Sequence, residues 1–159
     1  MRPVQLKKNQ LGFTLIELLV VVTIIGIIAT IAVPNLLNAT QRARQRRTMG
    51  DMKTIANAIA QYLQDNSIVP LGGSIGTTVT TPNTSLNNVL IPTYITAIPD
   101  RDGWGNPFRY IVSARDSYTL ESRGRDGINN VNATRNDQNW DHDLMLSNGI
   151  FIASPDSGT

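Results

Sequence analysis

The sequence predicts an α+β fold in which one long N-terminal helix packs on a small antiparallel β-sheet. Three observations lead to this expectation. A strongly apolar run opens the chain, an amphipathic helical pattern continues it, and two pairs of short alternating segments follow. The 159 residues suffice for one globular domain and one additional element.

The apolar run covers residues 13–37 and contains a single charged residue, Glu17. Residues 18–37 carry no charge, and 20 such residues are about the length of a helix that spans a bilayer. In lipid the backbone can satisfy its polar groups only within the helix. Pro34 removes one backbone donor, so we expect a kink or local melting near residues 30–34.

An amphipathic helical pattern follows the run, with apolar residues at spacings of three and four: Met52, Ile55, Ala56, Ile59 and Leu63. We expect this helix to end near Asp65 and Asn66, ahead of Pro70. A continuous helix over residues 13–66 would be about 80 Å long. Because a domain of this size cannot bury such a helix, one half must lie in a membrane or against other molecules.

The rest of the chain predicts loops and β-hairpins. Residues 71–88 are rich in Gly, Ser, Thr, Asn and Pro, which is typical of a loop. Residues 108–112 and 118–121 alternate with period two and predict an antiparallel hairpin. Residues 143–146 and 150–152 predict a second pair around an Asn-Gly turn.

Composition excludes several kinds of chemistry. The chain has no cysteine, which rules out disulfides, thiolate metal sites and a cysteine nucleophile. Its one histidine, His142, cannot build a usual zinc site alone. No nucleophile elbow or phosphate loop occurs, so the sequence does not predict an enzyme.

Basic residues gather just after the apolar run, at Arg42, Arg44, Arg46 and Arg47. They are consistent with a solvated helix face or with contact to acidic side chains of a neighbouring subunit. The whole chain holds 14 basic and 12 acidic side chains, so nucleic acid is not an expected partner.

The N-terminal segment also differs from a generic secretory signal, because its apolar core is longer and contains a carboxylate. The stretch "GFTLIELLVVVTIIGIIATIAVPNL" resembles the N-terminus of type IV pilins and type II secretion pseudopilins. The resemblance implies cleavage between Gly12 and Phe13 by a prepilin peptidase and N-methylation of Phe13. It also matches Pro34 to the proline that interrupts the helix of that family.

This resemblance implies a pilin-like fold with four parts. Residues 1–12 would be a prepilin leader, and residues 13–37 a transmembrane and assembly helix. Residues 38–66 would be the amphipathic half of the helix, and residues 67–159 a periplasmic globular domain.

Glu17 has a plausible role in such an assembly. Cleavage would create a positively charged amine on Phe13. In the low-dielectric core of a filament, the Glu17 carboxylate could pair with the amine of an adjacent subunit. The alternative is a carboxylate near the membrane surface that reaches water or is protonated.

The stretch "IPDRDGWGNPFRYI" resembles the segment before the sheet of major, G-type pseudopilins, although Gly103 stands where that family usually has proline. We expect it to form a structural corner in which Trp104 covers the sheet and the lower half of the soluble helix. Asn-Pro at its end starts an extended segment.

The stretch "YTLESRGRDG" and the acidic loop after it resemble the calcium-binding loop of the same pseudopilins. Calcium prefers six to eight oxygen ligands, and this loop is rich in Asp and Asn. The resemblance leaves two alignments open, so the candidate ligands are Asp126, Asp137, Asp141 and Asp143. The alternative is a solvated polar loop without an ion.

Together these features predict a major-pseudopilin-like subunit that polymerises into a periplasmic filament for type II protein secretion. The resemblance implies a bacterial inner-membrane anchor and three kinds of partner besides its own copies: minor pseudopilins or pilins, an inner-membrane assembly platform and the prepilin peptidase. A type IV pilin of a surface pilus and a membrane-tethered periplasmic binding domain are the alternatives.

Overall fold

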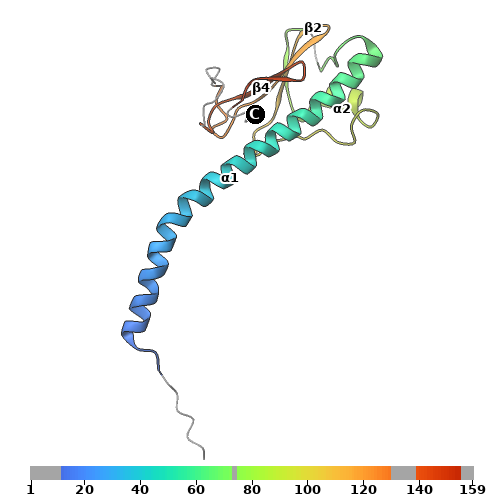
Figure 1. The fold of residues 1–159 in the computed structure, drawn as a ribbon. Coiled ribbons are helices and arrows are strands. Elements are labelled where there is room, and N and C mark those ends of the chain that lie inside the picture. Colours follow the sequence, from blue (N-terminus) through green and yellow to red (C-terminus); the bar gives the residue numbers. More distant parts are fainter. Residues whose placement is uncertain (1–11, 73–74, 130–138, 155–159) are drawn as a thin grey trace, which may run out of the picture. The chain divides into compact units, whose positions relative to one another are not determined.

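The computed structural model describes residues 12–72, 75–129 and 139–154 (Figure 1). Its elements are α1 (Leu15–Asn66), β1 (Thr78–Thr80), α2 (Thr84–Leu90), β2 (Arg109–Ala114), β3 (Ser117–Ser122), β4 (Leu144–Ser147) and β5 (Ile150–Ala153). The five strands form one antiparallel sheet in the order β1-β2-β3-β4-β5. The predicted α+β class is therefore confirmed. The chain divides into two compact units, Met1–Ala39 and Thr40–Thr159, which are described separately.

The first unit exposes apolar side chains along its part of α1. Phe13 is 82% exposed and Leu15 is 86% exposed. None of the most apolar stretch of α1 is buried. By length and composition, α1 is the one helix in the described part of the chain that could cross a membrane. A surface this apolar needs lipid or protein neighbours, because water does not stabilise it.

Pro34 lies inside α1, which is helical without interruption on both sides of it. The expected local melting near residues 30–34 is therefore wrong. Proline deletes one bond of the backbone ladder, and the turns before and after it keep theirs. A kink at Pro34 stays a prediction.

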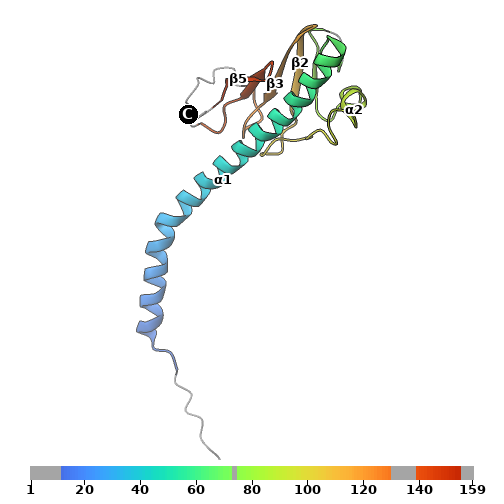
Figure 2. The same ribbon diagram turned by 45° about the vertical axis from the view of Figure 1, so that its right-hand side comes forward.

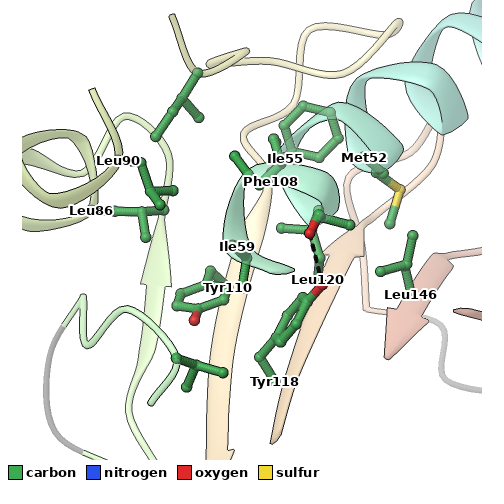
Figure 3. Packing of buried hydrophobic residues seen from close by; sticks show 14 of the residues in the cluster. Met52, Ile55, Ile59, Leu86, Leu90, Phe108, Tyr110, Tyr118, Leu120 and Leu146 are labelled. Carbon is green, nitrogen blue, oxygen red and sulfur yellow. Dashed lines mark hydrogen bonds between the residues drawn. The ribbon is translucent and has the colours of Figure 1, made fainter. Parts of the chain in front are cut away.

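The core of the second unit lies between α1 and the sheet. Figures 1 and 2 show the C-terminal half of α1 along one face of the sheet. Of the side chains that the periodicity predicts, Met52, Ile55, Ala56 and Ile59 are buried and Leu63 is partly buried, and α1 ends at Asn66 as expected. Gln45, Thr48 and Ala58 are buried as well. Figure 3 shows these side chains meeting those of α2 and the strands. The labelled members of the core are Met52, Ile55, Ile59, Leu86, Leu90, Phe108, Tyr110, Tyr118, Leu120 and Leu146.

Both predicted hairpins are present. β2 pairs with β3, so Tyr110 lies opposite Leu120, and both side chains are fully buried. β4 pairs with β5 around the Asn-Gly turn. Asn148 has φ 46° and Gly149 has φ 82°, as a two-residue hairpin turn requires.

The loop predicted for residues 71–88 is only partly correct, because β1 and most of α2 lie within this range. Asn83 caps α2, since its side chain accepts a hydrogen bond from Leu86 N at 2.8 Å. Leu86 and Leu90, four residues apart, are both buried. An N-cap followed by apolar residues at helical spacing was present in the sequence. The loop prediction followed the polar composition of residues 71–88 and not this helical signal.

Candidate functional site

The predicted cleavage site lies in non-helical chain immediately before α1. Gly12 and Phe13 precede the helix and are exposed. Apart from Gly12 and its neighbours in the chain, no atom of the described residues lies within 4 Å of the position that a Cβ on Gly12 would occupy. An exposed, non-helical bond of this kind is accessible to a peptidase.

Glu17 forms a capping box with Thr14 at the start of α1. Its Oε2 accepts hydrogen bonds from Thr14 N at 3.1 Å and from Thr14 Oγ1 at 2.9 Å. In return Thr14 Oγ1 accepts from Glu17 N at 3.3 Å. Two backbone donors of the first turn are thereby satisfied. This arrangement was not among the predictions, although Thr-x-x-Glu before an apolar run is its sequence signature.

Asp102 organises the predicted corner between residues 101 and 107. The residue is 4% exposed. Its Oδ1 accepts from Trp104 N at 2.9 Å and from Asn106 N at 2.8 Å. Its Oδ2 accepts from Ser122 Oγ at 2.7 Å. One buried carboxylate therefore sets the backbone path of the corner and attaches it to β3.

The corner is bound to α1 at two points, which agrees with the role predicted for Trp104. Trp104 Nε1 donates to Gln41 Oε1 at 2.7 Å, and its ring packs against the core. Gly103 N donates to Thr48 Oγ1 at 2.9 Å. A Cβ on Gly103 would lie 2.9 Å from the carbonyl carbon of Arg44. A proline here would lack the N–H that donates to Thr48 and would overlap the backbone of α1.

The second predicted motif packs directly against the corner. Asn106 Nδ2 donates to Gly124 O at 2.7 Å. Gly124 has φ 61°, and a Cβ there would lie 2.7 Å from His142 O. Arg125 N donates to Trp140 O at 2.8 Å. The corner, the 124–127 turn and the 139–143 segment therefore form one connected structure.

The four candidate calcium ligands have different surroundings. Asp137 lies outside the described residues. Asp126 is exposed, and its Oδ1 accepts from Ile128 N at 2.9 Å. Asp141 receives two bonds from Arg125, at 2.7 and 2.8 Å. Asp143, immediately before β4, is fully buried.

These surroundings fit a cation only in part. A fully buried carboxylate such as Asp143 requires a cation or hydrogen-bond donors nearby. The charge of Asp141 is already matched by the guanidinium of Arg125, whose pKa this carboxylate raises. Among residues 12–72, 75–129 and 139–154, no group of three His, Cys, Asp or Glu side chains is arranged to hold a metal. Any hard ion here would need additional oxygen ligands, such as backbone carbonyls.

The basic cluster after the apolar run consists of exposed side chains on α1. Arg47 Nε lies 3.6 Å from Asp51 Oδ2, one helical turn further along. The described geometry is compatible with both the solvated and the subunit-contact interpretation.

Comparisons with known proteins match both halves of the chain. Residues 7–33 match the family model of the prokaryotic N-terminal methylation motif. Residues 35–140 match that of type II secretion system protein G. The second match includes the corner around Asp102 and the turn at Gly124.

Three similar proteins are named type II secretion system core protein G. Type II secretion system core protein G of Vibrio cholerae is 36% identical over 126 residues, which cover 76% of this chain and 86% of the relative. The core protein G of Pseudomonas aeruginosa is 34% identical over 143 residues, which cover 86% of this chain and 99% of the relative. The core protein G of Escherichia coli is 33% identical over 133 residues, which cover 75% of this chain and 84% of the relative.

Proposed function

Because the chain belongs to the type II secretion system protein G family, we propose that it is the major pseudopilin subunit of a type II secretion system. It polymerises into a periplasmic filament that moves substrates outward. The observation that carries this proposal is the protein G match over residues 35–140, directly after a methylation motif. The family is one of structural subunits, so the chain acts by assembly. The relatives' names favour neither a surface pilus nor a tethered binding domain.

Processing would convert the chain into its assembly-competent form. Prepilin peptidase would cut between Gly12 and Phe13, and Phe13 would then be N-methylated. The match to the methylation motif and the exposed, non-helical bond before α1 support this step. The leader, residues 1–12, would be discarded.

Glu17 would contribute to the order of subunits in the filament. In the free chain, Thr14 already holds its carboxylate through two hydrogen bonds. In the filament core, the same carboxylate would pair with the Phe13 amine of an adjacent subunit. Because an unpaired charge is costly in an apolar core, one axial register would be favoured over the others.

Membrane placement follows from the same premise. Residues 13–37 would anchor the subunit in the bacterial inner membrane, with the leader in the cytoplasm and residues 67–159 in the periplasm. The exposed apolar side chains of α1 support such an anchor. Besides copies of itself, the subunit would meet minor pseudopilins, an inner-membrane assembly platform and prepilin peptidase.

Substitution of Glu17 tests the proposal in cells that carry the matching secretion system. Glu17→Val should leave cleavage and methylation intact, as intact-mass analysis would show, while filaments and secretion are lost. Thr30→Val is the matched control, because Thr30 Oγ1 donates to Gly26 O of its own helix at 2.8 Å. Normal filaments with Glu17→Val would refute its assembly role. Normal secretion in cells that lack this chain entirely would refute the function.

We also propose that a calcium ion stabilises the acidic loop, with Asp126, Asp137, Asp141 and Asp143 as candidate carboxylates. The full burial of Asp143 supports this idea. When bound, the ion would supply a positive charge that ties the loop to the sheet. We expect calcium to raise the Tm relative to EGTA, and Asp143→Asn to abolish that difference while Asp116→Asn preserves it. An equal Tm in calcium and EGTA would reject the site.

A further inference from the structure

Four arginines lie together on the exposed side of α1, shortly after the apolar segment. They are called the basic cluster here, and all four side chains are exposed: Arg42, Arg44, Arg46 and Arg47. At about 100° of rotation per residue, they spread over about 200° of the helix circumference. The remaining arc contains Gln45 and Thr48, which are buried. The basic cluster therefore covers the side of α1 that is turned away from the rest of the globular domain.

The positive charge of the basic cluster is largely uncompensated. No acidic residue occurs in the sequence between Glu17 and Asp51. Arg47 Nε lies 3.6 Å from Asp51 Oδ2, and an exposed pair of this kind is weak. The other three arginines form no ion pair among the described residues. Within the described structure, three guanidinium groups are thus available to anions from outside the chain.

The position of the basic cluster in the chain determines which anions it can meet. The proposed anchor ends at residue 37, five positions before Arg42. Five residues rise about 7.5 Å as a helix and reach at most about 18 Å when extended. The polar layer of a bilayer extends roughly 5–8 Å beyond the hydrocarbon core on each side. Side chains of a helix lean towards its N-terminus, so the four arginines lean back towards the anchor. Their guanidinium groups can therefore reach headgroup phosphates.

Two features favour lipid headgroups over an acidic surface of a neighbouring protein. A protein partner contacts one side of a helix, whereas a headgroup layer surrounds the helix at one level. The spread of the cluster over about 200° fits the layer. In addition, all four residues are arginine, whose planar guanidinium group binds phosphate through paired hydrogen bonds.

We propose that the basic cluster binds the phosphate groups of anionic phospholipids at the membrane surface. Clusters of basic residues beside a membrane-spanning helix are attracted to anionic lipid, and salt screens this attraction. These contacts stabilise the subunit in the membrane before it assembles. The proposal rests on the membrane placement proposed above, but it requires neither filament formation nor secretion.

A lipid titration of the full chain in dodecyl maltoside micelles tests the proposal. The sample carries ¹⁵N-labelled arginine, and the reporters are the Nε–Hε resonances of the four arginines. Phosphatidylglycerol, which is anionic, is compared at constant ionic strength with phosphatidylcholine, which has a phosphate but no net charge. We expect saturating shifts with phosphatidylglycerol, none with phosphatidylcholine, and weaker binding at high salt.

Substitutions in the basic cluster should weaken this binding in steps. Each Arg→Gln change should reduce the affinity for phosphatidylglycerol about fivefold. The double variant with Arg42→Gln and Arg46→Gln should therefore bind on the order of 25-fold more weakly. Lysine at both positions should retain most of the affinity, because the charge is kept. Arg115→Gln is the matched control for charge, since Arg115 is exposed in the β2–β3 turn. It should bind as the unmodified chain does.

Four results would overturn the proposal. The first is an equal response to phosphatidylcholine, and the second is an unchanged affinity in the double glutamine variant. The third is saturation by inorganic phosphate at the same concentration as by phosphatidylglycerol, which would assign the cluster to free anions. The fourth is a shift that follows protein concentration and not lipid, which would indicate contact with a second copy of the chain. The titration of the unmodified chain decides the question even if the double variant fails to fold, and it leaves the filament and secretion tests independent.

Discussion

Removal of the Asp102 carboxylate should destabilise the soluble domain more than any single surface change. Asp102→Ala deletes hydrogen bonds to Trp104 N, Asn106 N and Ser122 Oγ. Each hydrogen bond to a charged group contributes about 1.5–3 kcal/mol. Because the three bonds share one carboxylate, their energies are not additive. We expect a loss of about 3–5 kcal/mol, a large part of the roughly 5–15 kcal/mol that stabilises a typical domain.

Thermal unfolding of the full chain in detergent measures this loss. For a domain of this size, it corresponds to a fall in Tm of about 10 °C or more. Asp102→Asn should cost less, about 3 °C, because its amide keeps one acceptor and Ser122 Oγ can accept from the new N–H. Asp116→Ala is the control, since Asp116 is exposed in the β2–β3 turn.

A Tm for Asp102→Ala within about 2 °C of the unmodified chain would refute the reasoning. It would mean that the corner holds its path through the contacts of Trp104 and Gly103 with α1 alone. An equal loss in Asp116→Ala would instead attribute the effect to net charge.

Gly103→Pro should lower the Tm by more than Gly103→Ala, because both overlap the α1 backbone but only proline also removes the donor to Thr48. The control is Gly50→Ala, at an open position of α1, which should raise the free energy of unfolding by about 1 kcal/mol. A destabilised Gly50→Ala would contradict the explanation of the Gly103 variants by backbone overlap. Burial raises the pKa of Tyr118 from 10.0 to about 12, and burial also raises that of Tyr110. The folded state keeps these protons longer than the unfolded state, so stability is fully present below pH 10 and falls as the pH rises towards 12. The free energy of unfolding should fall by about 1.4 kcal/mol per pH unit for each tyrosine. In alkaline unfolding, Tyr118→Phe should show a shallower fall with pH than the unmodified chain. An unchanged slope would contradict the role given to Tyr118.

The N-terminal apolar segment could be predicted in outline because its evidence is local. An uncharged run of bilayer length and a Thr-x-x-Glu step depend only on neighbours in the chain. The capping box was not among the predictions, which gave Glu17 either a partner from another subunit or a place near the membrane surface. Thr14, three residues earlier, already provides one.

The candidate calcium loop shows what evidence from neighbours in the chain leaves open. Asp126 and Asp141 look alike as acidic residues in a polar stretch. Only the fold brings Arg125 against Asp141, and thereby makes the two carboxylates unequal. The β1–α2 segment was misjudged for a related reason, because Leu86 and Leu90 gain their importance from a core formed by distant residues.

By itself, the sequence determined the long α1, its end at Asn66, both hairpins and the apolar anchor. Each depends on periodicity, turn chemistry or length over a few neighbouring residues. Only the tertiary structure decided that Gly103 must lack a side chain, that Asp102 holds the corner, and that Arg123 and Arg109 share Glu121. The physical reason is that these features depend on contacts between residues far apart in the chain, such as Gly103 with Arg44, Asp102 with Ser122 and Arg109 with Glu121. Spacing along the chain does not encode their distances or their burial.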